Sequence, residues 1–112
     1  MAVANKVENI TTFSYGQSII LTLKDPDPPH GAQDISSYTT RTVVVRSPDQ
    51  SKTVTATASF VTDGTEGKIS FFFADGDIDR HGKWSGQVKL EKTSVELRSS
   101  LFEMIVAEGL NT

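Results

Sequence analysis

The amino-acid sequence predicts an all-β protein, a small antiparallel immunoglobulin-like β-sandwich of about seven strands. Apolar and polar residues alternate with period two through most of the chain, as in strands that bury one face. Threonine, valine, isoleucine and phenylalanine dominate these segments, and they suit a pleated surface. Turn-forming residues separate the segments at short intervals, and no segment carries an extended apolar stripe with helical spacing.

The first half of the chain contains three predicted strands. Residues 18–24 (SIILTLK) are rich in isoleucine and leucine, which indicates a strand with at least one buried face. Residues 39–47 (TTRTVVVRS) alternate in the same way. Residues 52–61 (KTVTATASFV) give the clearest alternation, with threonine and serine on one face and apolar residues on the other.

The second half adds the remaining strands. Residues 68–73 (KISFFF) and 83–91 (KWSGQVKLE) each predict one strand. Residues 94–108 (SVELRSSLFEMIVAE) predict one long strand or two. The side chains that we assign to the core, and to folding only, include Leu21, Val43, Phe71, Trp84 and Ile105.

Turn signals lie between these segments. Residues 25–31 (DPDPPHG) form a proline-rich loop, because proline lacks the donor that a strand needs. Residues 47–51 (SPDQS) resemble a type I turn, and 62–67 (TDGTEG) supply two glycines. Residues 91–94 (EKTS) form a polar hairpin tip.

The domain organisation is simple. At 112 residues the chain is long enough for one core, and residues 13–108 are predicted to form the sandwich. Residues 1–12 are polar and are predicted to form an N-terminal arm that frays in the isolated domain. The segment MAVANKVENI lacks a basic region followed by an apolar block, so we expect no secretory signal.

Composition excludes several classes of function. A net charge of −3 provides no basic stripe, which argues against a nucleic-acid partner. The apolar runs are far shorter than the roughly 20 residues of a membrane helix, so no membrane partner is expected. The absence of cysteine excludes a disulfide framework, a zinc–thiolate site and thiol catalysis.

The acidic segment ADGDIDRHG places Asp75, Asp77 and Asp79 at the opening spacing of a calcium loop. An EF-hand loop requires glycine at its sixth position and a bidentate carboxylate at its twelfth. Counted from Asp75, those positions hold Arg80 and Gly86. We therefore predict a solvated turn that delivers the chain into the following strand, with Gly86 providing no closing ligand and no metal bound.

The remaining candidate residues do not assemble into a catalytic or cofactor site. His30 and His81 are far apart in the sequence, and neither has a second ligand at metal-binding spacing. No nucleophile elbow, dinucleotide fingerprint or phosphate-binding loop is present. Trp84, Tyr15 and Tyr38 could line a sugar-binding face, although Trp84 fits better as a core anchor. We predict a protein that is not an enzyme and needs no cofactor.

The order of these features resembles the immunoglobulin-like N-terminal domain of the phage baseplate upper protein family. The resemblance covers residues 13–107. It rests on a glycine-led first strand, a turn that begins at Asp34, a strand that ends in a Pro-Asp turn, a glycine-flanked strand followed by the acidic turn before Gly82, and a closing alternating strand. These are GQSIILTLKD, DISSYT, TVVVRSPDQ, DGTEGKISFFFADGDIDRHGKWSGQVKLE and SSLFEMIVAE. Gln50 departs from the family's turn glycine, and no long C-terminal region follows the domain here.

The resemblance implies a virion structural protein of a tailed bacteriophage, made in the host cytoplasm. Such an adaptor, baseplate or decoration subunit would dock onto other virion proteins in many copies. The alternative is a carbohydrate-binding module for attachment to the host surface. Besides the N-terminal arm, the residues that we assign to partner binding are in the proline-rich loop and the acidic turn: Asp25, Pro26, Asp27, Pro28, Pro29, His30, Asp75, Asp77 and Asp79.

Overall fold

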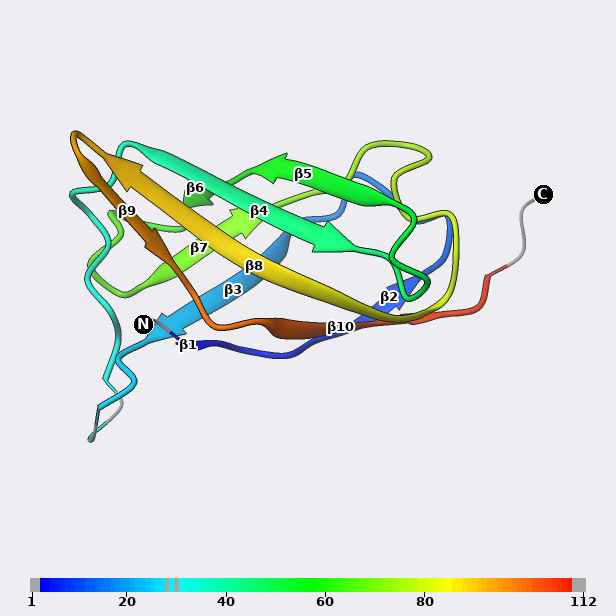
Figure 1. Ribbon diagram of the computed structural model, residues 1–112, viewed down its shortest axis with the longest axis horizontal. Coiled ribbons are helices and arrows are strands. Elements are labelled where there is room, and N and C mark those ends of the chain that lie inside the picture. Colours follow the sequence, from blue (N-terminus) through cyan, green and yellow to red (C-terminus); the bar gives the residue numbers. More distant parts are fainter. Residues whose placement is uncertain (1–2, 28, 30, 110–112) are drawn as a thin grey trace.

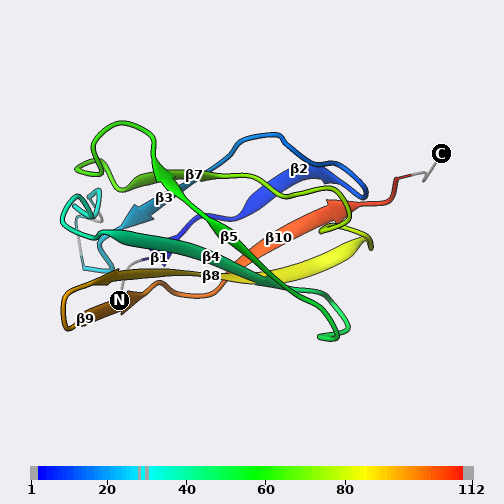
Figure 2. The ribbon, with the colours of Figure 1, turned by 90° about the horizontal axis from the view of Figure 1, so that it is seen from above.

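Two β-sheets pack face to face in the computed structural model of this protein, which describes residues 3–27, 29 and 31–109 (Figures 1 and 2). The four-stranded sheet has the order β1 (Val3–Ala4), β3 (Ile19–Lys24), β7 (Lys68–Phe71) and β6 (Ser59–Phe60). The six-stranded sheet has the order β2 (Val7–Thr11), β10 (Phe102–Ala107), β8 (Gly82–Lys92), β4 (Thr40–Arg46) and β5 (Thr53–Thr57), and β9 (Val95–Arg98) also pairs with β8. The predicted all-β sandwich is confirmed.

The predicted strands appear close to their expected positions, with two subdivisions. The segment 52–61 forms β5 and β6, which belong to different sheets. Fully buried Ala58 lies between them, so the chain crosses from one sheet to the other at that residue. The segment 94–108 also forms two strands, β9 and β10, and both pair with the long strand β8.

The prediction of a frayed N-terminal arm over residues 1–12 is wrong for the part that the structure describes. Strand β1 pairs with β3, and β2 runs parallel to β10, so the sandwich is not wholly antiparallel. Val7 and Ile10 are only 5% and 9% exposed and belong to the core. They lie three positions apart because the β2–β10 register shifts between Met104 and Val106, which hides the strand from a test for period two.

Four of the five predicted core side chains are buried: Leu21, Val43, Phe71 and Trp84. The assignment of Ile105 to the core is wrong, because that side chain is only partly buried. The opposite phase of β10 faces the core instead, with Phe102, Met104 and Val106 buried. Gly86 on β8 makes this phase possible, since a Cβ atom there would lie 2.3 Å from the Phe102 ring.

Ser99 joins β9 to β10 and maintains the pairing with β8. Its backbone N–H donates to the Val88 carbonyl (2.9 Å), and its Oγ accepts a hydrogen bond from the Val88 N–H (3.0 Å). The same hydroxyl donates to the Ser100 carbonyl (2.8 Å), and Ser99 is 1% exposed. A side chain thus satisfies a backbone group of β8 where the neighbouring strand changes.

Glycines set the turns where the sequence predicts them. Gly64 and Gly67 in the 62–67 turn have φ angles of 88° and 72°, in the left-handed region. A Cβ atom on Gly67 would lie 2.4 Å from the Leu23 carbonyl oxygen, so this turn sits directly against β3.

In the described residues, no helix is long and apolar enough to cross a membrane.

Candidate functional site

The three carboxylates of the acidic turn do not converge on one point. Asp77 closes its own turn: its Oδ2 accepts from the Ala74 N–H (2.8 Å), and its N–H donates to the Ala74 carbonyl (3.0 Å). Asp75 is exposed. Asp79 instead forms ion pairs with Lys52 (3.2 Å) and Arg80 (2.9 Å). Across the described residues, no group of three acidic or histidine side chains is placed to hold a metal ion.

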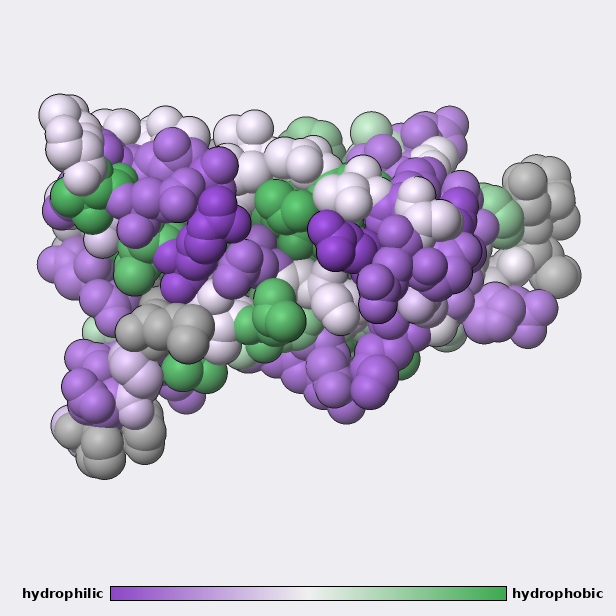
Figure 3. All heavy atoms as spheres, viewed as in Figure 1, coloured by the Kyte–Doolittle hydropathy of each residue, from purple (hydrophilic) through white to green (hydrophobic). Residues whose placement is uncertain are grey.

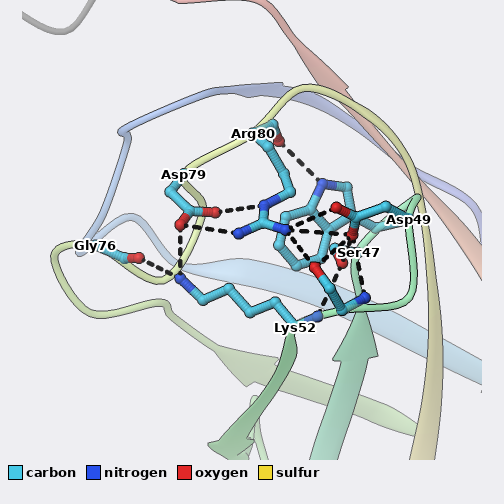
Figure 4. A network of polar contacts seen from close by, with 8 residues as sticks. Ser47, Asp49, Lys52, Gly76, Asp79 and Arg80 are labelled. Carbon is cyan, nitrogen blue, oxygen red and sulfur yellow. Dashed lines mark hydrogen bonds and ion pairs between the residues drawn. The ribbon is translucent and has the colours of Figure 1, made fainter.

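Arg80 is the centre of a polar network that joins the acidic turn to the β4–β5 turn (Figure 4). Its Nε donates to Asp79 Oδ1 (2.9 Å), and its Nη1 donates to Asp49 Oδ2 (3.0 Å). The same Nη1 also donates to Ser51 Oγ (2.7 Å). Lys52 Nζ donates to the Gly76 carbonyl (2.6 Å), which adds a second link between the two turns.

The hydrogen bonds in this network favour the charged form of each group. Hydrogen bonds from the hydroxyls of Ser47 and Ser51 and the Ser51 N–H, together with the charge of Arg80, hold the pKa of Asp49 far below its ordinary value. The hydrogen bond from Arg80 lowers the pKa of Asp79, with a further contribution from Lys52. The network is exposed to solvent, so its ion pairs contribute modestly to stability and mainly fix geometry.

The network also connects these turns to the core. The Trp84 indole Nε1 donates to the Arg80 carbonyl (3.1 Å), and Trp84 is fully buried. Ser47 closes the other side, because its N–H donates to the Lys52 carbonyl (2.9 Å) and its Oγ accepts from the Lys52 N–H (3.1 Å). The β4–β5 turn is therefore held in one position relative to the sandwich.

This turn forms one end of a groove on the outer face of the six-stranded sheet. The groove has a volume of about 440 Å³. Its floor comes from outward-facing residues of β8, and β4 and the β9–β10 connection border its sides. The lining residues are Val44, Arg46, Ser47, Pro48, Gln50, Lys83, Ser85, Gly86, Gln87, Lys89, Arg98 and Leu101. Figure 3 shows this face, with apolar side chains in the middle and hydrophilic ones on both sides.

The groove is lined by basic and neutral residues. Four of the 11 lysine and arginine side chains of the protein lie along it, and none of the lining residues is acidic. Glutamates outside the groove pair with three of the four cations: Glu103 with Lys83 (3.5 Å), Glu91 and Glu96 with Lys89 (3.4 and 3.6 Å), and Glu96 with Arg98 (3.3 Å). Arg46 has no ion-pair partner in the described part of the chain.

The outer face of the four-stranded sheet has a different character. Ile20 is 52% exposed and Phe72, just after β7, is 60% exposed. Ile20 pairs with Ser70, which is two residues from Phe72, so the two apolar side chains are diagonal neighbours on one face. Val61, the residue after β6, is exposed on the same face but lies opposite Lys68, four residues along β7 from Phe72. We call Ile20, Val61 and Phe72 the apolar patch.

The two segments predicted to bind partners lie at opposite ends of the sandwich, whose longest dimension is 42 Å (Figure 1). In the proline-rich loop, Asp25, Pro26, Asp27 and Pro29 are exposed, whereas Pro28 and His30 lie outside the described residues. The Asp27 N–H donates to Asp25 Oδ1 (2.9 Å), which stabilises the start of the loop. The structure does not bring this loop together with Asp75, Asp77 and Asp79.

The aromatic residues considered for a sugar-binding face are dispersed. Trp84 is fully buried, which confirms its assignment to the core. Tyr38 is partly buried and stacks with Lys92, whose Nζ lies 4.8 Å from the ring centroid. Tyr15 is exposed at the surface.

Sequence reasoning missed the groove. Its floor corresponds to the polar phase of residues 83–89, which contains Lys83, Ser85, Gln87 and Lys89 and is visible in the sequence. Arg46 comes from β4 and Leu101 from the β9–β10 connection, and their approach to β8 follows from the strand register.

Comparisons with known proteins identify a fold and no family. No family model matches the sequence, and no curated protein matches it. The structure is similar to the crystal structure of CopC from Methylosinus trichosporium OB3b, with a TM-score of 0.53 and 11% sequence identity. The similarity covers 100% of this chain and 99% of that chain. At this identity the likeness supports the β-sandwich architecture alone.

Proposed function

We propose that this chain is a structural subunit of a tailed-phage virion, an adaptor, baseplate or decoration protein that docks onto a neighbouring virion protein through the apolar patch. The virion assignment comes from the ordered resemblance over residues 13–107 to the baseplate upper protein family. The docking assignment rests on one observation, the exposure of Ile20, Phe72 and Val61 on a single sheet face. Adjacent exposed apolar side chains mark interaction surfaces more often than isolated ones do.

Burial of the patch would provide the driving force for docking. Side chains of the size of isoleucine and phenylalanine each gain about 1.5–3 kcal/mol on going from full exposure to full burial. Ile20 and Phe72 are 52% and 60% exposed in the free chain, so about half of that gain is left for docking. Ser59 and Ser70 lie beside them on the outward face and offer hydroxyl groups at the edge of such a contact. An apolar centre with polar groups at its rim is typical of protein–protein interfaces.

The test replaces Ile20 and Phe72 by threonine, which retains β propensity and removes most of the apolar surface. Purified particles are then assayed for this chain by quantitative mass spectrometry. We expect incorporation to fall at least about tenfold, as for the loss of an interface hot spot. Thr55→Ser, on the outer face of the other sheet, is the matched control and should incorporate normally.

Two outcomes would contradict this proposal in different ways. Normal incorporation of a folded Ile20→Thr/Phe72→Thr variant would show that the patch is not the docking surface. Particles that contain no copy of the wild-type chain would refute the virion role itself. Thermal melting of both variants before assembly separates a docking defect from a folding defect, since exposed substitutions usually change stability by about 0.5 kcal/mol or less.

The alternative of a carbohydrate-binding module has weaker support. An aromatic platform needs exposed rings, and Trp84, the largest candidate, is inside the core. Tyr15 and Phe72 remain exposed. A glycan array probed with the wild-type chain and with Tyr15→Ala tests this alternative directly.

A further inference from the structure

We infer that the groove on the outer face of the six-stranded sheet binds an extended acidic polypeptide segment of a partner protein. This inference concerns a different face from the apolar patch, and it does not depend on the virion assignment. Three features of the groove support it: its charge, its length and the chemistry of its middle section.

Charge complementarity selects an acidic ligand. The protein has a net charge of −3, yet Arg46, Lys83, Lys89 and Arg98 gather along this groove, with no acidic residue in its lining. Opposite charges across an interface steer association and select the partner. Glu91, Glu96 and Glu103 at the margin pair with three of these cations, so the groove and its margin together keep one excess positive charge, and Arg46 is the cation that contributes most to selecting a carboxylate.

The cations of the groove can accept a new partner. Arg46 has no ion-pair partner among the described residues. The existing pairs of Lys83, Lys89 and Arg98 have N–O distances of 3.3–3.6 Å and lie at the surface. Exposed pairs of this type contribute little. A ligand carboxylate can share these cations with the glutamates, whose side chains stay exposed to solvent.

The spacing of the cations requires an elongated ligand. Lys83 and Lys89 face the same side of β8 and are six residues apart, which is about 20 Å along a strand. Arg46 lies toward the Lys83 end, because it pairs with Ser85, and Arg98 lies at the other end, because it pairs with Lys89. An extended peptide of about seven residues spans that distance, with acidic residues at both ends.

The middle of the groove suits a peptide better than a uniform polyanion. Val44 and Leu101 provide apolar contacts there, and Leu101 is 70% exposed. Gln87 Nε2 donates to the Ser99 carbonyl (2.9 Å), which fixes the amide and leaves its Oε1 to accept from a ligand N–H. The fitting sequence thus has acids at both ends and a small apolar centre.

The probe is a fluorescein-labelled heptapeptide, DDTLTDD, and its uncharged counterpart NNTLTNN. Binding to the full chain is measured by fluorescence anisotropy, and the site is mapped from backbone amide shifts in an NMR titration. We expect DDTLTDD to bind and to perturb amides of β4, β8 and β9, with affinity that falls as salt is added. NNTLTNN should bind at least about tenfold more weakly.

Matched variants test the groove itself. Arg46→Gln should weaken DDTLTDD binding at least about fivefold, whereas Lys24→Gln, which removes one exposed charge on the other sheet, should change it less than about twofold. Leu101→Thr is a second groove variant, which tests the apolar contact in the middle of the groove independently of the charge at Arg46.

Three results would overturn the assignment of an acidic ligand to this groove. These are equal binding of the two peptides, equal effects of Arg46→Gln and Lys24→Gln, or amide shifts confined to the four-stranded sheet. A thymidine oligonucleotide of equal charge that binds more tightly than DDTLTDD would refute the assignment to a polypeptide. If the chain self-associates and Arg46→Gln abolishes that association, the occupant of the groove is a second copy of this chain and not a segment of another protein.

Discussion

Replacing Ser99 with alanine should weaken the protein more than the loss of one small hydroxyl suggests. The Ser99 hydroxyl is the acceptor for the Val88 N–H (3.0 Å) at a position that is 1% exposed. Alanine leaves that donor buried without a partner, which costs about 1–3 kcal/mol, and it also removes the bond to the Ser100 carbonyl. We expect a total loss of about 2–3 kcal/mol in the free energy of unfolding.

The expected loss converts into a measurable change in melting temperature. For a chain of 112 residues, 1 kcal/mol corresponds to about 4 °C, so Tm should fall by about 8–12 °C. Ser85→Ala is the control, because Ser85 lies on β8, as Val88 does, and its side chain is exposed. Urea unfolding gives the free energy, and hydrogen exchange of the Val88 amide gives the local effect.

The hydrogen-exchange measurement separates the proposed cause from a general destabilisation. The Val88 amide should exchange faster in Ser99→Ala under native conditions, because it has lost its acceptor. A stability loss below about 0.5 kcal/mol, equal to that of Ser85→Ala, would refute the assignment of Ser99 as a substitute for a backbone acceptor.

Three further predictions follow from the core, a turn and the polar network. Trp84→Ala should lower the free energy of unfolding by about 3–5 kcal/mol, measured in urea, and a loss below about 1 kcal/mol would place the indole at the surface. Gly67→Ala should cost about 2–3 kcal/mol by the same assay, because φ is 72° and the added Cβ meets the Leu23 carbonyl, whereas Gly31→Ala should be nearly neutral; equal effects would contradict the turn geometry. Folding lowers the pKa of Asp49, so the ionised carboxylate stabilises the protein above the ordinary carboxyl range, and this contribution is lost as the pH falls through the lowered pKa. The difference in unfolding free energy between wild type and Asp49→Asn should therefore shrink from pH 5 to pH 2. A constant difference would argue against hydrogen bonds to an ionised Asp49.

The strands that the sequence predicts are those with regular alternation. In residues 18–24, 39–47 and 83–91 the buried side chains stand at alternate positions, so the period alone identifies both the strand and its inner face. Strand β2 was missed because its two buried residues, Val7 and Ile10, stand three apart across a register shift. A local pattern cannot show an irregularity that is produced by pairing with a strand about 95 residues away.

The sequence does not show which face of a strand points toward the core where both faces carry apolar residues. In residues 101–106, Leu101 and Ile105 compete with Phe102, Met104 and Val106, and the sequence supports either choice. The structure selects the second set, because the Phe102 ring occupies the space that Gly86 leaves on β8. That choice depends on which residues face each other across two strands.

The sequence by itself determined the all-β class, most strand positions, the turns and the burial of Trp84. All of these follow from local alternation and local backbone preference, which are properties of neighbouring residues. Only the tertiary structure decided that Arg80 would join Asp79 to Asp49 and that Arg46 would share a groove with Lys89 and Arg98. These contacts depend on strand order and register, which are fixed when the core packs as a whole and not by any one segment.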